Sequence, residues 1–447
     1  MRQHRITRRQ LLSGLGHTAL LSFLGKVNVL AQATPPDYKA LVCIFLSGGN
    51  DSHNMVVPLN GPDFIAYKNA RGTLALPDGN GQLIPVQNID GVPYGLNPGL
   101  QALAPFWSQG VLGVVANTGM LVQPVSRVEF LGNAKPLPTN LFSHSDQIQQ
   151  MQSGVPSASG GTGWGGRSVD QVQNLNGAAS FPPAISIAGP ALFCKGSVIQ
   201  SASLWPGFNL DASGMNLWPQ AAADARKNGY QQILQFNSGL ELIQVANHVR
   251  QDAISLNAMM SGASATLNTP FPGTDIGLQL QQVAQLIKLR TSTGMSRQVF
   301  FVSLGGFDTH GSQSWQQWDL LRQLSEALAA FYNSTVELGL ADKVTSFTLS
   351  DFGRTLQPSG TGSDHGWGSH HLVLGGAVQG GRLHGTFPTL ALGGPDDAGS
   401  RGVLIPTTSI DQYGATMAQW LGVPTAQLTS VFPNLVNFAN PTLGFLG

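Results

Sequence analysis

A continuous apolar run near the start of the chain sets the strongest constraint on its fold. Residues 40–47 read ALVCIFLS and are followed directly by Gly48 and Gly49. A strand with one face in solvent alternates apolar and polar residues, whereas an uninterrupted run indicates a strand that is buried on both faces. Such strands occur in parallel sheets covered by helices. We therefore expect an α/β fold with a largely parallel central sheet and helices on both faces.

Further strand-like runs and helical stretches alternate along the chain. The other expected strands are short apolar or β-branched runs, at residues 111–115, 184–188, 298–304, 343–349 and 371–374. Helices are expected over 315–338 and 409–421, with Ser409 as the N-cap of the second. Apolar residues at helical spacing between 228 and 290 predict a hairpin of helices. We expect one large domain over residues 34–447, with a helical insertion at about 219–293.

The amino-terminal segment predicts an export signal. Residues 7–12 read TRRQLL, and the paired arginines precede a modest apolar stretch that glycines and polar residues interrupt. The paired arginines resemble the address that the twin-arginine export machinery reads. Small residues at 29–33 (VLAQA) suit cleavage after Ala31 or Ala33, and the interruptions disfavour a membrane anchor. We expect residues 1–33 to be removed, the export machinery to be a partner, and the mature chain to be periplasmic or secreted and no integral membrane protein.

The composition excludes one class of partner. Charged residues make up 10% of the 447 residues, against about 25% in an average globular chain, and hydrophobic residues make up 42%. Lys plus Arg number 23, as do Asp plus Glu, so the chain has no basic excess for binding nucleic acid. We therefore expect no nucleic-acid partner.

The chain has two cysteines, Cys43 and Cys194. They could form one disulfide in an oxidising compartment. Cys43 lies inside the apolar run, which favours a buried free thiol for that residue.

Polar clusters follow the ends of the expected strands. They read GGNDSH at 48–53, GGFDTHG at 305–311, SDFGR at 350–354 and, in a loop close behind, SDHGWGSHH at 363–371. Ligands of open α/β sheets bind beyond the carboxyl ends of the strands, so these clusters are expected to converge. Six of the ten histidines lie in them or in a related segment: His53, His144, His310, His365, His370 and His371.

Aspartate and histidine arriving together indicate a divalent-metal site, because carboxylate oxygen and imidazole nitrogen are ligands of zinc and also suit manganese. Asp308 and His310 are one residue apart, so on extended backbone they face the same side and could bind one ion. Each aspartate also has a structural interpretation: Asp51 can form an Asx-turn, Asp308 can cap a helix and Asp364 can stabilise a turn. Those alternatives stay open residue by residue.

These motifs resemble the alkaline phosphatase and sulfatase superfamily, and more closely its large group of uncharacterised, twin-arginine-exported bacterial members. Beyond the signal, the resemblance is carried by LSGGNDSHN (46–54), GGFDTHG (305–311), LSDFGRT (349–355), DHGWGSHH (364–371) and the late helix at 411–422. It spans most of the chain. It implies an alkaline phosphatase/sulfatase-like fold with a two-metal site for phosphoryl or sulfuryl transfer.

The resemblance also implies roles for individual residues. The implied metal ligands are Asp51, Asp308, His310, Asp351 and either His365 or His371; zinc, manganese and calcium all remain open as the ion. Arg354 is implied to neutralise the charge of a small anionic ester substrate, because its fork suits phosphate or sulfate. The alternative for Arg354 is a salt bridge that anchors its loop.

The chain departs from the superfamily pattern at several positions. Asp308-x-His310 stands where Asp-x-x-x-His is usual, Asp351-Phe352 stands where Asp-His or Asp-Asn is usual, and the sulfatase C-x-P-x-R sequence is absent. The best candidate nucleophile is Ser145, with His144 beside it, where a helix dipole favours an anionic oxygen. Ser52 is a second candidate.

Two functions of different classes therefore remain open. The first is an exported metal-dependent hydrolase of phosphate or sulfate esters. The second is a non-catalytic exported binding or assembly protein that keeps the fold, with or without a structural metal.

Overall fold

The computed structural model describes residues 37–77, 83–157, 161–177, 179, 181–206, 215, 217–260 and 266–447. The predicted export signal, residues 1–33, lies outside the described residues. Within the described residues, no helix combines the length and the apolar character needed to cross a membrane.

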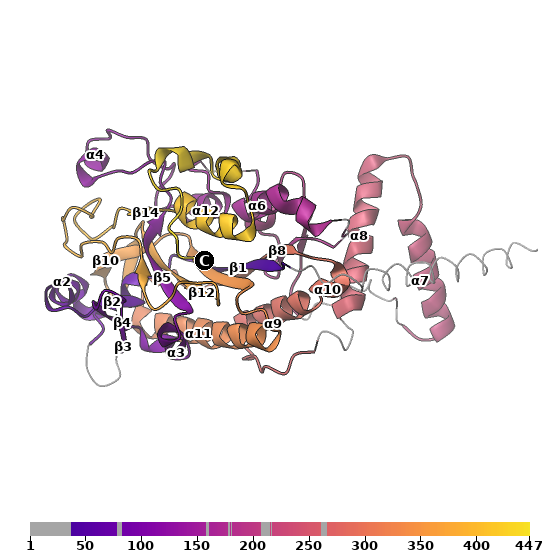
Figure 1. Ribbon diagram of the computed structural model, residues 1–447, viewed down its shortest axis with the longest axis horizontal. Helices are drawn as coiled ribbons and strands as arrows, with labels where there is room; N and C mark the ends of the chain where they lie inside the picture. Colours follow the sequence, from indigo (N-terminus) through magenta and orange to yellow (C-terminus); the bar gives the residue numbers. More distant parts are fainter. Residues whose placement is uncertain are drawn as a thin grey trace, which may run out of the picture.

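A nine-stranded sheet forms the centre of the described chain (Figure 1). Its strands are β1 (Lys39–Leu46), β5 (Leu112–Gly119), β6 (Ala184–Ser186), β7 (Ser201–Ser203), β8 (Arg297–Leu304), β9 (Val344–Ser350), β12 (Ser369–Leu374), β13 (Leu383–His384) and β14 (Thr408–Ser409). Their order is β13-β5-β12-β9-β1-β8-β6-β7, with β14 beside β5. Every pairing is parallel except those of β12 with β5 and β9. The expected largely parallel sheet is confirmed.

Helices cover both faces of this sheet. In Figure 1, α6 (Trp164–Val172) and α12 (Ile410–Leu421) lie above it, and α3 (Ala104–Ser108), α9 (Asp275–Lys288) and α11 (Gln313–Glu337) lie below it. The side chains of β1 alternate between the two cores: Val42 and Ile44 pack with α9 and α11, while Cys43 and Phe45 pack with α6 and α12. Each large apolar side chain buried in this way stabilises the fold by about 1.5–3 kcal/mol. The uninterrupted apolar run is thus explained by burial on both faces.

Smaller elements surround the sheet. A three-stranded sheet contains β2 (Val56–Pro58), β3 (Ile84–Gln87) and β4 (Pro93–Leu96), and a two-stranded one contains β10 (Arg354–Ser359) and β11 (Gly362–His365). The remaining α-helices are α2 (Gly61–Arg71), α4 (Arg127–Leu131), α5 (His144–Ser153), α7 (Gln220–Leu234), α8 (Glu241–Met260), α10 (Arg290–Thr293) and α13 (Leu428–Val431). The β10–β11 hairpin and α5 matter most here, because both carry residues of the site.

Helices α7 and α8 form a hairpin beside the main body, as Figure 1 shows. The Arg250 guanidinium on α8 donates a 2.6 Å hydrogen bond to the Tyr230 hydroxyl on α7. The next helix, α9, packs against the sheet instead, where Ile276, Leu280 and Val283 are fully buried in the core below it. The bounds of a helical insertion at 219–293 therefore stay a prediction.

The sequence pattern located most elements of the sheet. Each of the six expected strands overlaps one observed strand, and the expected late helix is α12, capped by Ser409. The Ser409 hydroxyl accepts from Asp411 N, and Gln412 reaches back to Ser409 N, which satisfies two donors that the first helical turn leaves open. Cys43 and Cys194 are both buried free thiols, and burial raises the pKa of each.

Candidate metal centre

The polar clusters converge at the carboxyl edge of the sheet. Asp308 and His310 lie in the loop after β8, and Asp351 directly follows β9. His365 ends β11, and His144 is the first residue of α5. Since β8, β1 and β9 are adjacent and parallel, the loops after them emerge at one edge, and α5 and the β10–β11 hairpin bring histidines to it.

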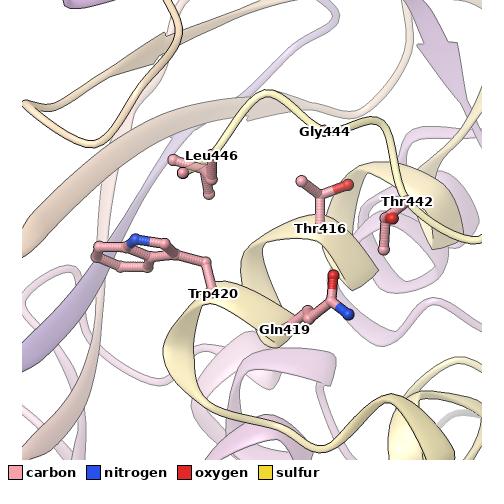
Figure 2. Close-up of a pocket in the computed structure, with 7 residues that line it drawn as sticks. Thr416, Gln419, Trp420, Thr442, Gly444 and Leu446 are labelled. Carbon is pink, nitrogen blue, oxygen red and sulfur yellow. The ribbon is translucent and has the colours of Figure 1, made fainter.

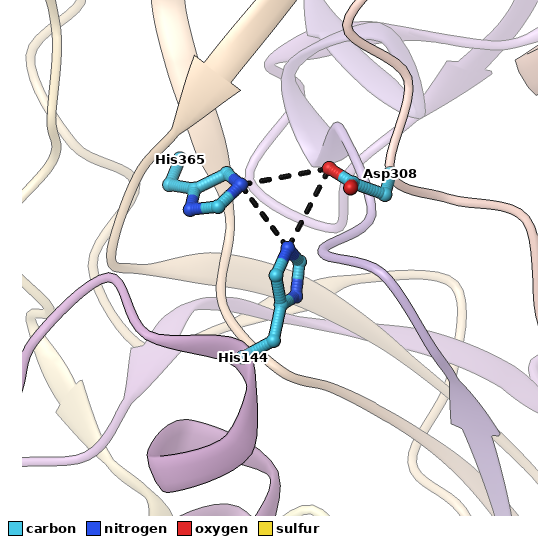
Figure 3. A group of neighbouring side chains, drawn as sticks. All are labelled: His144, Asp308 and His365. Carbon is cyan, nitrogen blue, oxygen red and sulfur yellow. Dashed lines mark hydrogen bonds and ion pairs between the residues drawn. The ribbon is translucent and has the colours of Figure 1, made fainter.

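Three side chains in this region point their ligand atoms at one another (Figure 3). His144 Nε2 lies 3.1 Å from His365 Nε2, and Asp308 Oδ1 lies 3.6 Å from the first and 3.5 Å from the second. A tetrahedral zinc ion with ligand bonds of 2.0–2.2 Å separates its ligand atoms by about 3.3–3.6 Å. The spacing of these three atoms and their chemistry, two imidazole nitrogens and one carboxylate oxygen, therefore fit a divalent ion.

The outer nitrogen of each histidine is held by a hydrogen-bond acceptor. His144 Nδ1–H donates to Asp351 Oδ2 at 2.7 Å, and His365 Nδ1–H donates to the Phe142 carbonyl at 2.8 Å. These bonds fix the tautomers, so in the neutral rings both Nε2 atoms carry lone pairs. Histidines that bind metals are oriented by a carboxylate or a backbone carbonyl in the same manner.

The electrostatics of the group call for a cation at its centre. Two lone-pair nitrogens and a carboxylate oxygen at these distances repel one another unless a positive charge lies between them. Burial lowers the pKa of His365, and the neighbouring His144 and Arg354 lower it further. The hydrogen bond to Phe142 raises this pKa, but the net shift is downward and favours the neutral ring. Protonation of His365 is thus opposed, whereas a metal ion meets all three acceptors.

Asp351 is placed behind the histidine rather than among the ligand atoms. Its Oδ2 accepts from His144, its Oδ1 accepts from Gly48 N at 3.1 Å, and the side chain is almost fully buried. Burial raises its pKa, while the hydrogen bonds from His144 and Gly48 act in the opposite direction. The structure therefore places Asp351 where it orients His144, and the ligand role implied for it stays a prediction.

His310 offers a further candidate ligand atom next to Asp308 and His365. Its Nε2 lies 3.0 Å from Asp308 Oδ1 and 3.1 Å from His365 Nε2. Its Nδ1 lies 3.5 Å from Asp364 Oδ1, a longer contact than the 2.7 Å hydrogen bond between His144 and Asp351. His310 lies outside the group formed by His144, His365 and Asp308, but it can share Asp308 and His365 with a second ion.

Arg354 anchors Asp308 and is closed to solvent. Its Nη1 donates to Asp308 Oδ1 at 2.7 Å and to the Gly48 carbonyl at 3.2 Å, its Nη2 donates to the Ser363 carbonyl, and its side chain is 0% exposed. Burial alone would raise the pKa of Asp308, but the hydrogen bond and charge of Arg354, with His310 and His144, lower it. The anchoring interpretation of Arg354 fits this geometry, and the substrate contact does not.

Asp51 and His371 lie outside this group. The Asp51 carboxylate is buried and occupied by Arg71, Gln313 and His53 N, which combines a buried ion pair with the Asx-turn considered from sequence. His371 is buried on β12 and stacked on Tyr413, with Nδ1 3.5 Å from Thr348 Oγ1. The structure does not bring either residue to the ligand atoms of His144, His365 and Asp308.

The two candidate nucleophiles differ in exposure and in hydrogen bonding, and Ser145 lies at the amino-terminal turn of a helix as expected. Ser145 is exposed on the first turn of α5, where its hydroxyl lies 3.1 Å from Ser143 Oγ and donates to Asp146 Oδ2 at 3.2 Å. Ser52 is buried, and its hydroxyl has no hydrogen-bond partner among the described residues. His144, expected beside a nucleophile, contributes a candidate ligand atom instead.

The role of the Phe142 carbonyl could not be predicted from residue type. A backbone oxygen leaves no residue-type pattern, and only the positive φ of Phe142, 72°, shows that the chain turns there to present it to His365. The Asp364 carboxylate was noted as part of a cluster, but only as a turn residue. Its contact with His310 becomes visible only in three dimensions.

A shallow pocket elsewhere has different chemistry (Figure 2). It has a volume of about 210 Å³ and is lined by Thr416, Gln419, Trp420, Thr442, Gly444, Leu446 and Gly447. The Lys39 ammonium donates to the Trp420 carbonyl, which places this pocket near the start of β1, at the amino edge of the sheet. Its lining side chains include no acid or histidine, so it is no candidate for the chemistry described above.

The fold and this group of side chains define an α/β protein with a candidate divalent-metal centre at the carboxyl edge of a largely parallel sheet. The chain belongs to the family described as "Protein of unknown function (DUF1501)", which matches residues 127–429. That range includes His144, Asp308, His310, Asp351 and His365. No curated protein matches the chain.

Solved structures similar to this chain include three with named activities or ligands. The lipoteichoic acid synthase LtaP from Listeria monocytogenes has 9% identity, a TM-score of 0.36, and coverage of 92% of this chain and 81% of its own. The periplasmic domain of EptC from Escherichia coli in complex with Zn has 9% identity and a TM-score of 0.29. The match covers 76% of this chain and 73% of the EptC domain. A mutant of the alkaline phosphatase PafA has 13% identity and a TM-score of 0.27. The match covers 72% of this chain and 64% of the PafA chain.

Proposed function

We propose that this chain is an exported metal-dependent hydrolase of phosphate or sulfate esters, and a relative of the alkaline phosphatase and sulfatase superfamily. His144, His365 and Asp308 would hold a divalent ion, with His310 as a further ligand. One observation carries the proposal: three acceptor atoms from separate segments face one another at 3.1–3.6 Å, while hydrogen bonds fix both imidazoles with their lone pairs toward the group.

The position of the group suits catalysis more than structural support. Asp308 and His310 have side chains 47% and 49% exposed, so a solute can reach the ligand atoms from one side. A bound divalent ion supplies Lewis acidity toward an ester oxygen and lowers the pKa of coordinated water. The protein's own groups supply the rest: Asp351 and Phe142 orient the rings, and Arg354 keeps Asp308 ionised.

A second candidate is a non-catalytic exported protein that binds the ion without turnover. The placement of Ser145 favours it, because the Ser145 hydroxyl is bonded to Ser143 and Asp146 on its own helix turn. If the hydrolase is correct, its nucleophile is water rather than this hydroxyl. Ser145→Ala should then leave the rate of ester hydrolysis unchanged.

Metal analysis combined with turnover tests both candidates. The purified chain is stripped with a chelator, reloaded separately with zinc, manganese or calcium, and assayed with aryl phosphate and aryl sulfate. The hydrolase predicts bound metal and a rate that falls about 100-fold or more in Asp308→Asn, which removes a ligand charge. Asp319→Asn, which alters a partly exposed α11 carboxylate paired with Arg322, is the matched control.

The outcomes separate the alternatives. Bound metal with no turnover on either ester selects the binding protein. Failure to retain any of the three ions rules out the metal centre and the hydrolase, and leaves a non-catalytic protein that keeps the fold without a metal.

Export is a separate part of the proposal. We propose that residues 1–33 address the chain to the twin-arginine export machinery and that it acts in the periplasm or outside the cell. Fused to a reporter, these residues should direct it out of the cytoplasm, and joint replacement of Arg8 and Arg9 by lysine should retain it inside. Equal export of both fusions would contradict this address.

A further inference from the structure

The Asp364 carboxylate lies between Arg401 and the candidate metal ligand His310. Its Nη1 donates to Asp364 Oδ2 at 2.6 Å, and the other oxygen of Asp364 lies 3.5 Å from His310 Nδ1. The Arg401 side chain is 43% exposed, whereas that of Arg354 is 0% exposed. Of these two guanidinium groups beside the site, only Arg401 is open to a solute.

The Arg401 guanidinium has donors to spare. It has five N–H groups, and three of them have partners among the described residues. Nη1 donates to Asp364, Nε donates to Gln357 Oε1 at 3.3 Å, and Nη2 donates to the Pro358 carbonyl at 3.4 Å. One N–H on each terminal nitrogen therefore has no hydrogen-bond partner among the described residues. Spare N–H donors on a planar guanidinium can bind the oxygens of a phosphate or sulfate group.

The loop that carries Arg401 is held rigidly. The buried Asp397 carboxylate accepts four backbone N–H bonds from this region, from Gly393 (2.8 Å), Gly399 (2.9 Å), Gly402 (2.9 Å) and Val403 (3.1 Å). The Arg401 carbonyl accepts from Gln357 N on β10 at 2.9 Å, which joins the loop to the hairpin that carries His365. A donor fixed in this way loses little conformational freedom when it binds a ligand.

We propose that Arg401 is a specificity-determining residue that binds an anionic oxygen of the substrate beside the metal ligands. This inference rests on the proposed function and assigns recognition of the tetrahedral oxyanion to Arg401. Asp364 contacts both neighbours, since it accepts a hydrogen bond from the guanidinium and faces Nδ1 of His310 at 3.5 Å. A neutral ester would gain nothing from this contact.

Binding of inorganic phosphate and inorganic sulfate to the full-length purified chain tests the inference. Titration calorimetry gives the Kd of each anion on the zinc-loaded and metal-free protein, for wild type, Arg401→Lys and Arg401→Gln. Zinc content and melting temperature are recorded for every variant. Arg322→Gln is the matched control, because Arg322 is another partly exposed arginine paired with carboxylates, on α11.

We expect Arg401→Gln to raise the Kd of the anions at least about 10-fold, which is 1.4 kcal/mol, with zinc content unchanged. Arg401→Lys should give a smaller increase, since lysine keeps the charge without the fork. Arg322→Gln should match wild type. KM for aryl phosphate should follow the same order.

Three results would overturn the inference. One is an equal Kd in Arg401→Gln, Arg322→Gln and wild type; if wild type still hydrolyses esters, the proposed function survives. Another is loss of zinc in Arg401→Gln, which would place its effect on His310 through Asp364. The third is failure of wild type to bind either anion in either form. Absence of zinc binding by wild type would instead count against the proposed function.

Discussion

The Asp351 carboxylate lies 2.7 Å from Nδ1 of His144, although 207 positions separate the two residues in sequence. The contact joins the end of the buried strand β9 to the first residue of α5. It determines which imidazole nitrogen carries the hydrogen and therefore which one faces the other candidate ligands.

Replacing Asp351 by asparagine should weaken zinc binding about 10- to 100-fold without removing a ligand. The amide is uncharged and lowers the basicity of the His144 ring, and its NH₂ group can also face Nδ1 and reverse the tautomer. Competition with a fluorescent zinc chelator measures the Kd. An Asp351→Asn affinity equal to that of Asp319→Asn would mean that the hydrogen bond has no influence on the site.

Gly48 should tolerate no side chain. Its φ is +117°, and a Cβ there would lie 2.3 Å from Asp308 N. Gly48→Ala should therefore displace the Asp308 loop, lower the free energy of unfolding by about 1–3 kcal/mol and weaken zinc binding. Gly305→Ala is the control, since a Cβ at Gly305 meets no atom within 4 Å. Equal unfolding midpoints in urea for the two variants would contradict this prediction.

Asp411 should make the fold less stable as pH rises. Burial raises its pKa to about 7, against hydrogen bonds and the charge of Arg167 that lower it. The unfolded carboxyl, with a pKa of about 3.9, releases its proton first, so stability falls between about pH 4 and 7 and then levels off. The loss is on the order of 1–4 kcal/mol. Denaturant unfolding across this pH range should be flatter for Asp411→Asn, and an unchanged slope would show that this carboxyl does not titrate as stated.

His371 should make the fold less stable as pH falls. Burial lowers its pKa to about 3, so below the unfolded pKa of about 6.5 the unfolded chain binds a proton that the folded chain refuses. Stability should fall by up to about 1.4 kcal/mol per pH unit from pH 6.5 toward 3. His371→Phe keeps an aromatic ring against Tyr413 and removes the titration. Its melting temperature should depend less on pH below 6.5 than that of wild type, and parallel curves would contradict the assignment.

The strands were predictable from the sequence because positions buried on both faces of the sheet carry apolar residues. β1 is apolar at nearly every position since α9 and α11 cover one face and α6 and α12 cover the other. The antiparallel direction of β12 was not predictable, because a short buried strand has the same pattern in either direction.

The site was predictable as a region and less so by residue. Asp308, His310 and His365 could be named because carboxylate and imidazole side chains after strand ends are uncommon outside sites. The pattern could not separate Asp51, which forms a buried ion pair with Arg71, from a ligand. It also could not separate Asp351 from the ligands, because a carboxylate that orients a histidine and one that binds the ion look the same in sequence.

The candidate ligands come from α5, the loop after β8 and the end of β11, three segments that meet only when the chain has folded. Metal occupancy would then act as a reversible cross-link between distant parts of the polypeptide. At a free zinc concentration 1,000 times the Kd, such a link adds about 4 kcal/mol to the resistance of the protein to unfolding. A cell that withholds the ion would keep this protein easier to unfold and degrade, and one that supplies it would make it durable.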